Sequence, residues 1–172
     1  LGEFSGVSLL VSHDRGEVYR MSGRVCVLNA GKSEPVVDTT ALFERPSTLQ
    51  SALISGCKNC ARAELLDAQT VWVPEWNVRL ACGQSNGRAI THVGVRAHYI
   101  LPCTPDAENA VFCRIVDVTD DVFSRVFTLL PQGADEPLRS ELGKEGTERL
   151  QIGGEAYFAL PKEAVMLLDD AG

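Results

Sequence analysis

The chain has 172 residues, enough for one domain or for one domain with a small appended unit. Hydrophobic residues make up 45% and charged residues 23%, a globular composition that excludes a disordered chain. No apolar run approaches the roughly 18 residues of a membrane span. The formal net charge is −7, and the acidity lies in residues 101–172, which hold 6 basic and 14 acidic side chains. Tight binding of this last part to a phosphate backbone is therefore not expected.

The chain begins with Leu1 rather than Met, and Leu1–Gly6 lack the charged and apolar regions of a signal peptide. We therefore expect a fragment of a longer protein. Six cysteines are too few for a disulfide scaffold, and Cys26, Cys103 and Cys113 lie in apolar runs, where a free cysteine packs as a small hydrophobe. This usage favours a reducing, intracellular compartment.

The first half of the chain has the pattern of short strands. We predict strands over Val7–Ser12, Glu17–Met21 and Arg24–Asn29, because turn residues separate these β-branched runs. Residues 30–46 then resemble a long loop. Ser47–Ile54 fits a short helix or a strand equally well, since eight residues do not settle the period.

The middle of the chain changes character. Residues 57–92 contain two turns that resemble zinc knuckles, and we predict strands between them over Thr70–Val73 and Asn77–Ala81. Two longer strands are expected next, over Val93–Leu101 and Ala110–Val118.

The last third is predicted to hold a helix over Thr119–Leu130. Thr119 suits its N-cap, acidic residues follow in the first turn, and apolar residues recur at helical spacing. Residues 131–148 resemble a mobile linker. Arg149–Ile152 and Glu155–Ala159 are expected to form a hairpin, and a final short helix begins near Pro161.

The cysteine spacing is the sharpest local signal for chemistry. Cys57 and Cys60 have knuckle spacing, and Cys82 begins a second knuckle in which Ser85 replaces the last cysteine. Three interpretations stay open: a zinc site with Cys57, Cys60, Cys82 and a fourth ligand such as Ser85 or His92, a degenerate ribbon that folds without metal, and chance spacing.

Two tryptophans, Trp72 and Trp76, lie between the knuckles and near Arg79 and Arg88. Aromatic rings beside arginines on a sheet can stack the bases of single-stranded nucleic acid. The same rings can instead fill the core of a small ribbon.

Catalysis is not expected, because no catalytic motif and no converging set of acid, base and nucleophile is found. A small cysteine-dependent enzyme is kept as a third hypothesis, since any chain with six Cys and three His offers candidate pairs.

The element order resembles an oligonucleotide-binding (OB) fold with a zinc ribbon inserted at residues 57–92. It is similar to the C-terminal domain of the replication protein A large subunit. Within that group, the sequence most resembles the C-terminal part of shieldin complex subunit 2, over Leu53–Cys60, Cys113–Leu130 and Tyr157–Asp169. The resemblance implies a mainly-β OB-fold barrel over residues 46–172, with an intact or degenerate zinc ribbon and short capping helices. Residues 1–45 are then the first strands of this barrel or the end of a preceding OB domain.

The resemblance also implies a non-catalytic, nuclear scaffold in a complex that protects broken DNA ends. Its partner is a subunit of the shieldin subunit 1 type, with single-stranded DNA as a second ligand and no membrane. Any DNA track runs over the two tryptophans and three arginines, Trp72, Trp76, Arg79, Arg88 and Arg96. The alternative is an all-β structural or viral assembly domain with no nucleic-acid role.

Overall fold

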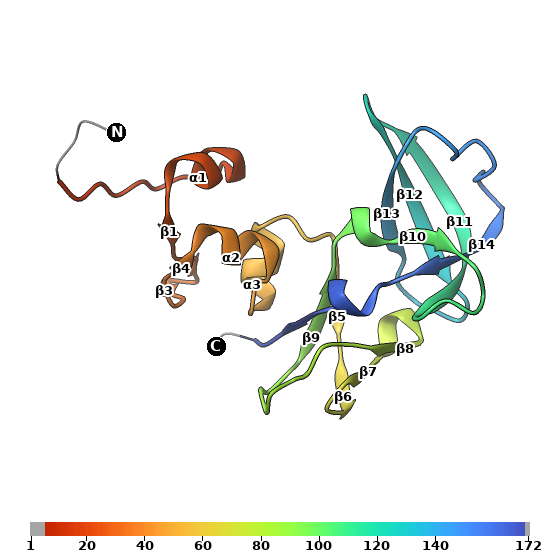
Figure 1. Cartoon of the computed structure of the whole chain (residues 1–172), viewed down its shortest axis with the longest axis horizontal. Helices are drawn as coiled ribbons and strands as arrows, with labels where there is room; N and C mark the ends of the chain where they lie inside the picture. Colours follow the sequence, from red (N-terminus) through yellow and green to blue (C-terminus); the bar gives the residue numbers. More distant parts are fainter. Residues whose placement is uncertain (1–5, 171–172) are drawn as a thin grey trace.

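The computed structural model describes residues 6–170 and is mainly β. The expected absence of a signal peptide over Leu1–Gly6 therefore lies, apart from Gly6, outside the described residues. Two regions are visible in Figure 1: a helical segment at residues 14–55 and a β region at residues 59–168. The proposed domain boundary at residue 45 stays a prediction. In the structure the β region begins after the last α-helix of the helical segment.

The helical segment holds three short helices and two pairs of two-residue strands. The elements are α1 (Arg15–Met21), β1 (Arg24–Val25), β2 (Leu28–Asn29), β3 (Lys32–Ser33), β4 (Val37–Asp38), α2 (Thr39–Glu44) and α3 (Leu49–Ile54). β1 pairs with β4, and β2 pairs with β3. The loop predicted over residues 30–46 is therefore wrong in part, since it contains two strands and a helix.

The strand predicted over Glu17–Met21 is wrong, because these residues belong to α1. The side chain of Asp14 accepts a hydrogen bond from the backbone N–H of Glu17 at 2.8 Å, which caps the first turn. Val7–Ser12, also predicted as a strand, pairs with no other strand within residues 6–170.

The helical alternative for Ser47–Ile54 is confirmed. Its N-cap is Thr48, whose hydroxyl accepts the N–H of Ser51 at 3.0 Å. Gly56 ends the turn with a φ of 99°, a left-handed conformation that glycine adopts without steric cost.

The β region consists of three antiparallel sheets. A five-stranded sheet has the order β10-β14-β11-β12-β13, a three-stranded sheet has the order β15-β9-β5, and another has the order β6-β7-β8. The strands are β5 (Asn59–Arg62), β6 (Glu64–Asp67), β7 (Thr70–Val73), β8 (Val78–Ala81), β9 (His92–Val95), β10 (Leu101–Cys103), β11 (Ala110–Asp120), β12 (Ser124–Pro131), β13 (Leu138–Gly143), β14 (Glu155–Ala159) and β15 (Met166–Leu168). The predicted strands over residues 70–73, 77–81 and 110–118 are thereby confirmed to within two residues.

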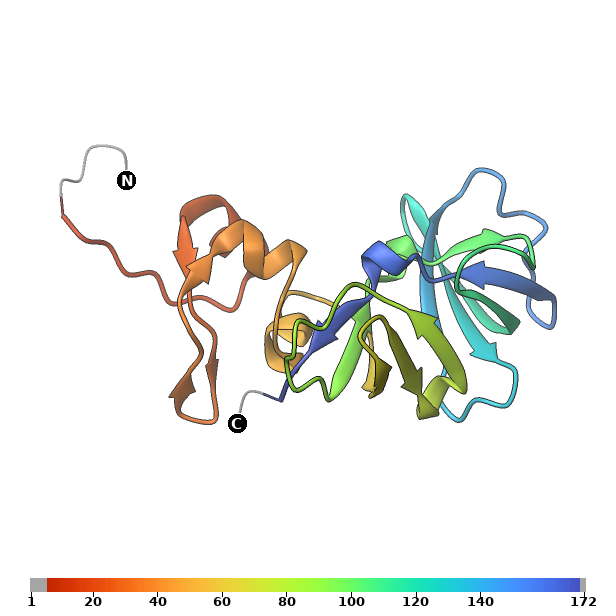
Figure 2. The ribbon, with the colours of Figure 1, turned by 60° about the horizontal axis from the view of Figure 1, so that its bottom comes forward.

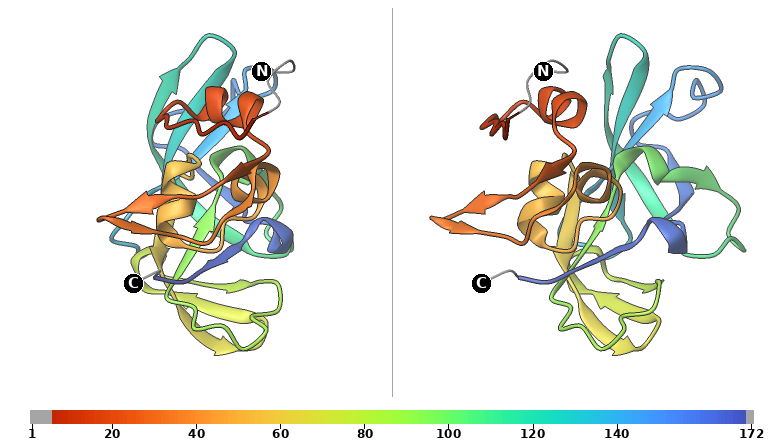
Figure 3. Two further views of the ribbon diagram at one scale, coloured as in Figure 1. Left: turned by 90° about the vertical axis from the view of Figure 1, so that its left-hand side faces the viewer. Right: turned by 60° about the vertical axis from the view of Figure 1, so that its left-hand side comes forward.

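A single strand over Val93–Leu101 is wrong. The chain leaves β9, turns through the 3-10 helix η2 (Ala97–Tyr99) and enters β10 in a different sheet. A second 3-10 helix, η1 (Pro74–Trp76), joins β7 to β8. The sheet β6-β7-β8 and the five-stranded sheet extend in opposite directions from β5 and β9 (Figure 3).

The helix predicted over Thr119–Leu130 is wrong, because these residues form the end of β11, a turn and β12. Asp121 closes the turn, with its carboxylate accepting the N–H of Val122 at 2.7 Å and its own N–H donating to the carbonyl of Ser124 at 2.9 Å. Aspartate suits such a turn as well as a helix start. Burial along β12 then alternates residue by residue, which is the period of a strand.

The end of the chain also departs from the prediction. The expected linker at 131–148 contains β13, and residues 149–152 form a loop, so that no hairpin forms around Gly153 and Gly154. β14 instead pairs with β10 and β11. The expected final helix is a 3-10 turn, η3 (Lys162–Ala164), followed by β15.

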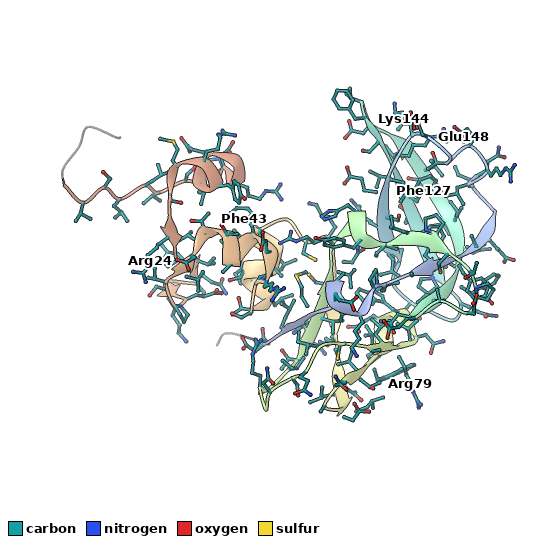
Figure 4. The ribbon with its side chains drawn as sticks, viewed as in Figure 1. Arg24, Phe43, Arg79, Phe127, Lys144 and Glu148 are labelled. Atoms are coloured by element: carbon teal, nitrogen blue, oxygen red, sulfur yellow. The ribbon has the colours of Figure 1, made fainter. Side chains whose placement is uncertain are left out.

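One core joins the sheets of the β region. Its largest fully buried side chains include Trp76, Phe127 and Phe158. Figure 4 shows Phe127 within the five-stranded sheet. Two asparagine side chains beside this core form hydrogen bonds to the backbone of neighbouring elements. Asn59 bonds to Val95 and Arg139, and Asn109 bonds to Ala81 and Leu160. The expected mainly-β, OB-like class is confirmed at this level.

Candidate functional site at the α3–β9 junction

The structure separates the predicted zinc ligands. Cys57 and Cys60 belong to a small apolar cluster with Ala52 and Leu168, whereas Cys82 is buried in the main core. Within residues 6–170, no three His, Cys, Asp or Glu side chains are grouped so that they could hold a metal ion. The segment at 57–92 forms β5 to β8 and the start of β9, and no zinc ribbon is seen there. Zinc binding stays a prediction to be tested by metal content.

The two alternative fourth ligands have other surroundings. Ser85 is buried, and its backbone N–H donates to the carbonyl of Ala68 at 3.1 Å. His92 lies on β9 with its Nδ1 3.0 Å from the hydroxyl of Thr91. Neither contact involves a cysteine.

The five residues predicted to bind nucleic acid do not form one surface. Trp76 is 2% exposed and fills the core, as the packing alternative for the tryptophans proposed. Trp72 is half-buried on β7 opposite Arg79 on β8, and Figure 4 shows Arg79 at the edge of the molecule, far from the helical segment. Arg88 and Arg96 lie elsewhere and are engaged in contacts within the chain.

Arg96 joins the β region to the helical segment. Arg96 directly follows β9. Its guanidinium donates to the carbonyl of Phe43, in the last turn of α2. It also donates to the carbonyl and the hydroxyl of Ser55, the residue after α3, at 3.1 and 3.0 Å. Figure 4 shows Phe43 on α2, and its ring packs edge-on against Tyr19 of α1 with the ring centroids 5.3 Å apart. One planar guanidinium thus fixes two helix ends against one strand.

Asp169, directly after β15, takes part in a second set of contacts at the same junction. The N–H of Leu49 donates to the carbonyl of Asp169, and the N–H of Asp169 donates to the carbonyl of Ser47, both at 3.0 Å. The guanidinium of Arg88 bonds the carbonyl of Ser47 at 2.7 Å and the carboxylate of Asp169 at 3.0 Å. Figure 2 shows β15 running from the β region back to the helical segment.

A carboxylate orders the start of α3. Glu34 accepts hydrogen bonds from the hydroxyls of Thr48, at 2.9 Å, and Ser51. It also lines a cavity of about 60 Å³ with Arg45 and Pro46. That volume suits about two water molecules and is far below the roughly 300 Å³ of a small-molecule pocket.

Cys57 and Cys60 lie next to the Arg96 contacts. The Cys57 thiol donates to the carbonyl of Asn59 at 3.3 Å. A hydrogen bond from the Cys60 thiol lowers the pKa of Cys57 and raises the pKa of Cys60, and the charge of Arg96 favours both thiolates. Burial instead raises the pKa of Cys113 to about 12, so that the core thiol is inert.

The sequence singled out Arg96 and the cysteine pair but not what they contact. The sequence places Arg96 on a DNA track, whereas in the structure its acceptors are backbone carbonyls more than forty positions earlier. Every residue has a backbone carbonyl, so the sequence does not indicate which carbonyls accept these bonds. The junction is therefore visible only in the fold.

No protein-family model matches the chain. It is similar to import ATP-binding proteins. It is 30% identical over 113 residues to the sn-glycerol-3-phosphate import ATP-binding protein UgpC of Paraburkholderia xenovorans (strain LB400), covering 60% of this chain and 31% of that protein. It is 24% identical over 181 residues to the Fe(3+) ions import ATP-binding protein FbpC 2 of Rhizobium meliloti (strain 1021), covering 95% of this chain and 45% of that protein. The chain thus spans less than half the length of these relatives.

Among solved structures, the fold is similar to that of the cytoplasmic molybdate-binding protein ModG. The TM-score is 0.55 at 14% identity, and the match covers 66% of this chain and 98% of the ModG chain. This share of the chain is close to that of the β region, residues 59–168. The likeness shows the fold.

These similarities overturn the resemblance to the replication protein A large subunit and to shieldin complex subunit 2. The sequence relatives belong to importers, and the fold likeness is to a molybdate-binding protein. A DNA-repair scaffold, a shieldin-type partner and single-stranded DNA as a ligand are therefore wrong. The expected nuclear localisation rested on the same resemblance and is no longer supported. The comparisons also give no support to the structural or viral assembly alternative or to a cysteine-dependent enzyme.

No helix within residues 6–170 is both long enough and apolar enough to cross a membrane.

Proposed function

We propose that this chain is the C-terminal part of the ATP-binding subunit of an importer, and that its β region is an accessory domain without a catalytic group of its own. The similarity to FbpC 2 over 95% of the chain supports the first part. The division into a helical segment and an OB-like β region supports the second, since the share of the chain that matches ModG, 66%, is close to the share that the β region makes up.

One structural observation carries the proposal. Val7, Leu9 and Val11 are apolar, pair with no strand of the described residues, and are 100%, 91% and 82% exposed. A largely apolar run, interrupted here only by Ser8 and followed by a helix, is typical of a strand buried on both faces of a parallel sheet. We infer that this run packs into the sheet of a preceding ATP-binding domain.

The junction then gives the β region a mechanical role. α2 and α3 follow the apolar run in the chain, and Arg96 and Asp169 bind these helices to β9 and β15. A movement of the β region is therefore transmitted to the helices nearest the ATP-binding domain. In this arrangement the protein works where ATP is available, inside the cell, in keeping with its free cysteines.

The test compares the native protein that contains this chain with the isolated 172 residues. We expect the native protein to bind and hydrolyse ATP with Mg²⁺, and the isolated chain to do neither. Backbone amides of residues 7–11 should exchange hydrogen fast in the isolated chain and become protected in the native protein. Absence of ATP binding by the native protein, or equally fast exchange of residues 7–11 in both, overturns the proposal.

A second candidate function is binding of a small oxyanion by the β region. The observation in its favour is that the chain matches 98% of the molybdate-binding ModG chain and so carries one whole copy of that fold. Calorimetric titration of the chain with molybdate, with sulfate as the comparison anion, tests it. Saturable heat with molybdate supports this function, and the absence of heat with both anions removes it without affecting the ATP-binding proposal.

A further inference from the structure

Two thiols are paired at the point where the helical segment passes into the β region. Cys57 follows α3 and is 2% exposed, and Cys60 lies on β5 and is half-buried. Both pack in the small cluster that includes Ala52 of α3 and Leu168 of β15. They are therefore neighbours in space as well as in sequence.

Gly94 shows that the two sulfur atoms share one face of the sheet. In the antiparallel pair β5–β9, Cys60 lies directly opposite Gly94. A Cβ added to Gly94 would lie 3.3 Å from the Sγ of Cys57. Side chains opposite each other in such a pair have Cβ atoms about 5 Å apart. The missing side chain of Gly94 thus leaves the room in which the Cys57 sulfur lies beside the Cys60 side chain.

The other four cysteines are placed away from this pair. Cys82 and Cys113 are buried in the main core, Cys103 lies on β10 of the five-stranded sheet, and Cys26 is exposed in the helical segment between β1 and β2. The arrangement selects one partner for Cys57.

We propose that Cys57 and Cys60 form a reversible disulfide, with a low-molecular-weight disulfide as the oxidant. The more exposed Cys60 passes its proton along the hydrogen bond to the Cys57 sulfur as it attacks one sulfur of the oxidant and expels the first small thiol. Cys57 then loses this proton to solvent and, as its thiolate, attacks the Cys60 sulfur of the mixed disulfide and expels the second. The two protein thiols lose two electrons and two protons, and the oxidant becomes two molecules of the reduced thiol.

The disulfide acts on the junction because Cys57 is bonded to α3. Its backbone N–H donates to the carbonyl of Ala52 at 2.9 Å, and Ser55, two residues before it, accepts two bonds from Arg96. Drawing Cys57 toward Cys60 pulls on the end of α3 and on the acceptors of Arg96. The oxidation state of the pair therefore sets how firmly the helical segment is held to β9.

The test uses the reduced, purified chain in mixtures of oxidised and reduced glutathione at a rising ratio. After the free thiols are alkylated and the protein is unfolded, trypsin cleaves after Lys58, between the two cysteines. A Cys57–Cys60 disulfide then holds the peptide that ends at Lys58 to the peptide Asn59–Arg62. The linked peptides have a mass two hydrogen atoms below the sum of the two free peptides. We expect them at a ratio of oxidised to reduced glutathione about tenfold below the ratio at which Cys103 acquires glutathione, because the second thiol of the pair is already in place.

Three variants complete the experiment. Cys60→Ser and Cys57→Ser should each abolish the linked peptides, and Cys103→Ser should leave them unchanged. Cys60→Ser replaces the less buried cysteine of the pair, so we expect this variant to fold. Circular dichroism checks that the variant is folded. Faster hydrogen exchange of the Ala52 and Ser55 amides on oxidation, absent in Cys60→Ser, is the expected effect on the junction.

Two results overturn the proposal. One is glutathione bound to Cys60 without the internal disulfide, and the other is pairing of Cys57 or Cys60 with other cysteines to a similar extent. Either result leaves the ATP-binding proposal intact, because that proposal is tested on the native protein with ATP.

Discussion

The helical segment and the β region are stabilised in different ways. α1 buries no residue, and exposed apolar side chains such as Val7, Leu28 and Val36 lie along the first part of the chain. The β region instead encloses a shared core of aromatic and aliphatic side chains. The two are held together by hydrogen bonds through Arg96, Arg88 and Asp169 and by the small apolar cluster between α3 and β15. A core that closes on itself can fold alone, whereas a segment held by hydrogen bonds and a small cluster depends on its neighbours.

The largest effect is expected in the shared core. Phe127 is fully buried, and Phe127→Ala should lower the free energy of unfolding by about 3–5 kcal/mol through lost burial and a cavity. The matched control is Phe123→Ala in the same hairpin, since Phe123 is 88% exposed and its loss should cost less than about 0.5 kcal/mol. Urea unfolding followed by tryptophan fluorescence measures both. Equal losses would show that the hairpin tip is buried in solution.

A smaller effect is expected at Asn59, a buried polar side chain beside the core. Asn59→Ala removes the partners of the Val95 carbonyl and of the N–H and carbonyl of Arg139. Because the Val95 carbonyl then stays buried without this hydrogen bond and the Arg139 backbone groups lose theirs at a partly buried position, the free energy of unfolding should fall by about 3 kcal/mol. The same urea experiment checks this value, with the exposed Gln84→Ala as the control. An unchanged stability would mean that water replaces the amide.

The sequence predicted the β region better than the helical segment for a physical reason. Short strands such as Thr70–Val73 consist of β-branched and aromatic residues, so that residue type alone indicates a strand. α1 buries nothing, and its only local sign is the cap formed by Asp14. Thr119–Leu130 was misassigned because its apolar spacing fits both periods, and the pairing of β12 with β11 and β13 decided the outcome.

The candidate site was predictable in its residues and not in its contacts. Cys57, Cys60 and Arg96 were all singled out, the first two by spacing and the third by charge. Their roles depend on Gly94, which faces Cys60 from another strand, and on the carbonyls of Phe43 and Ser55. Such partners are brought together by the path of the backbone, which single-sequence patterns do not encode.

The junction itself should respond locally rather than globally. Arg96→Ala removes three donated hydrogen bonds, which we expect to weaken the attachment of α3 by about 2 kcal/mol. The Ala52 and Ser55 amides should then exchange about 30-fold faster, since each 1.4 kcal/mol is a factor of ten. Amides of β11 and β12 should keep their exchange rates. Arg79→Ala, the matched control at an exposed arginine on β8, should change neither set.

Equal acceleration in the helical segment and in the five-stranded sheet would contradict the division between the two regions. It would mean that the Arg96 contacts and the shared core unfold as one cooperative unit. Arg96→Lys sharpens the result, because an ammonium group does not reproduce the planar donors that reach both Phe43 and Ser55.

The smallest expected effect concerns metal, where sequence and structure point in opposite directions. A zinc site built on Cys57, Cys60 and Cys82 would couple metal binding to folding, and a chelator would then lower the Tm by many degrees. In the structure Cys57 and Cys60 pack beside α3, while Cys82 lies in the shared core, so that the ligands would bridge two separate clusters. We therefore expect an unchanged Tm with a chelator and no stoichiometric zinc by elemental analysis. A large drop in Tm that Cys82→Ser abolishes would instead restore the ligand set predicted from the sequence and join the two clusters through the ion.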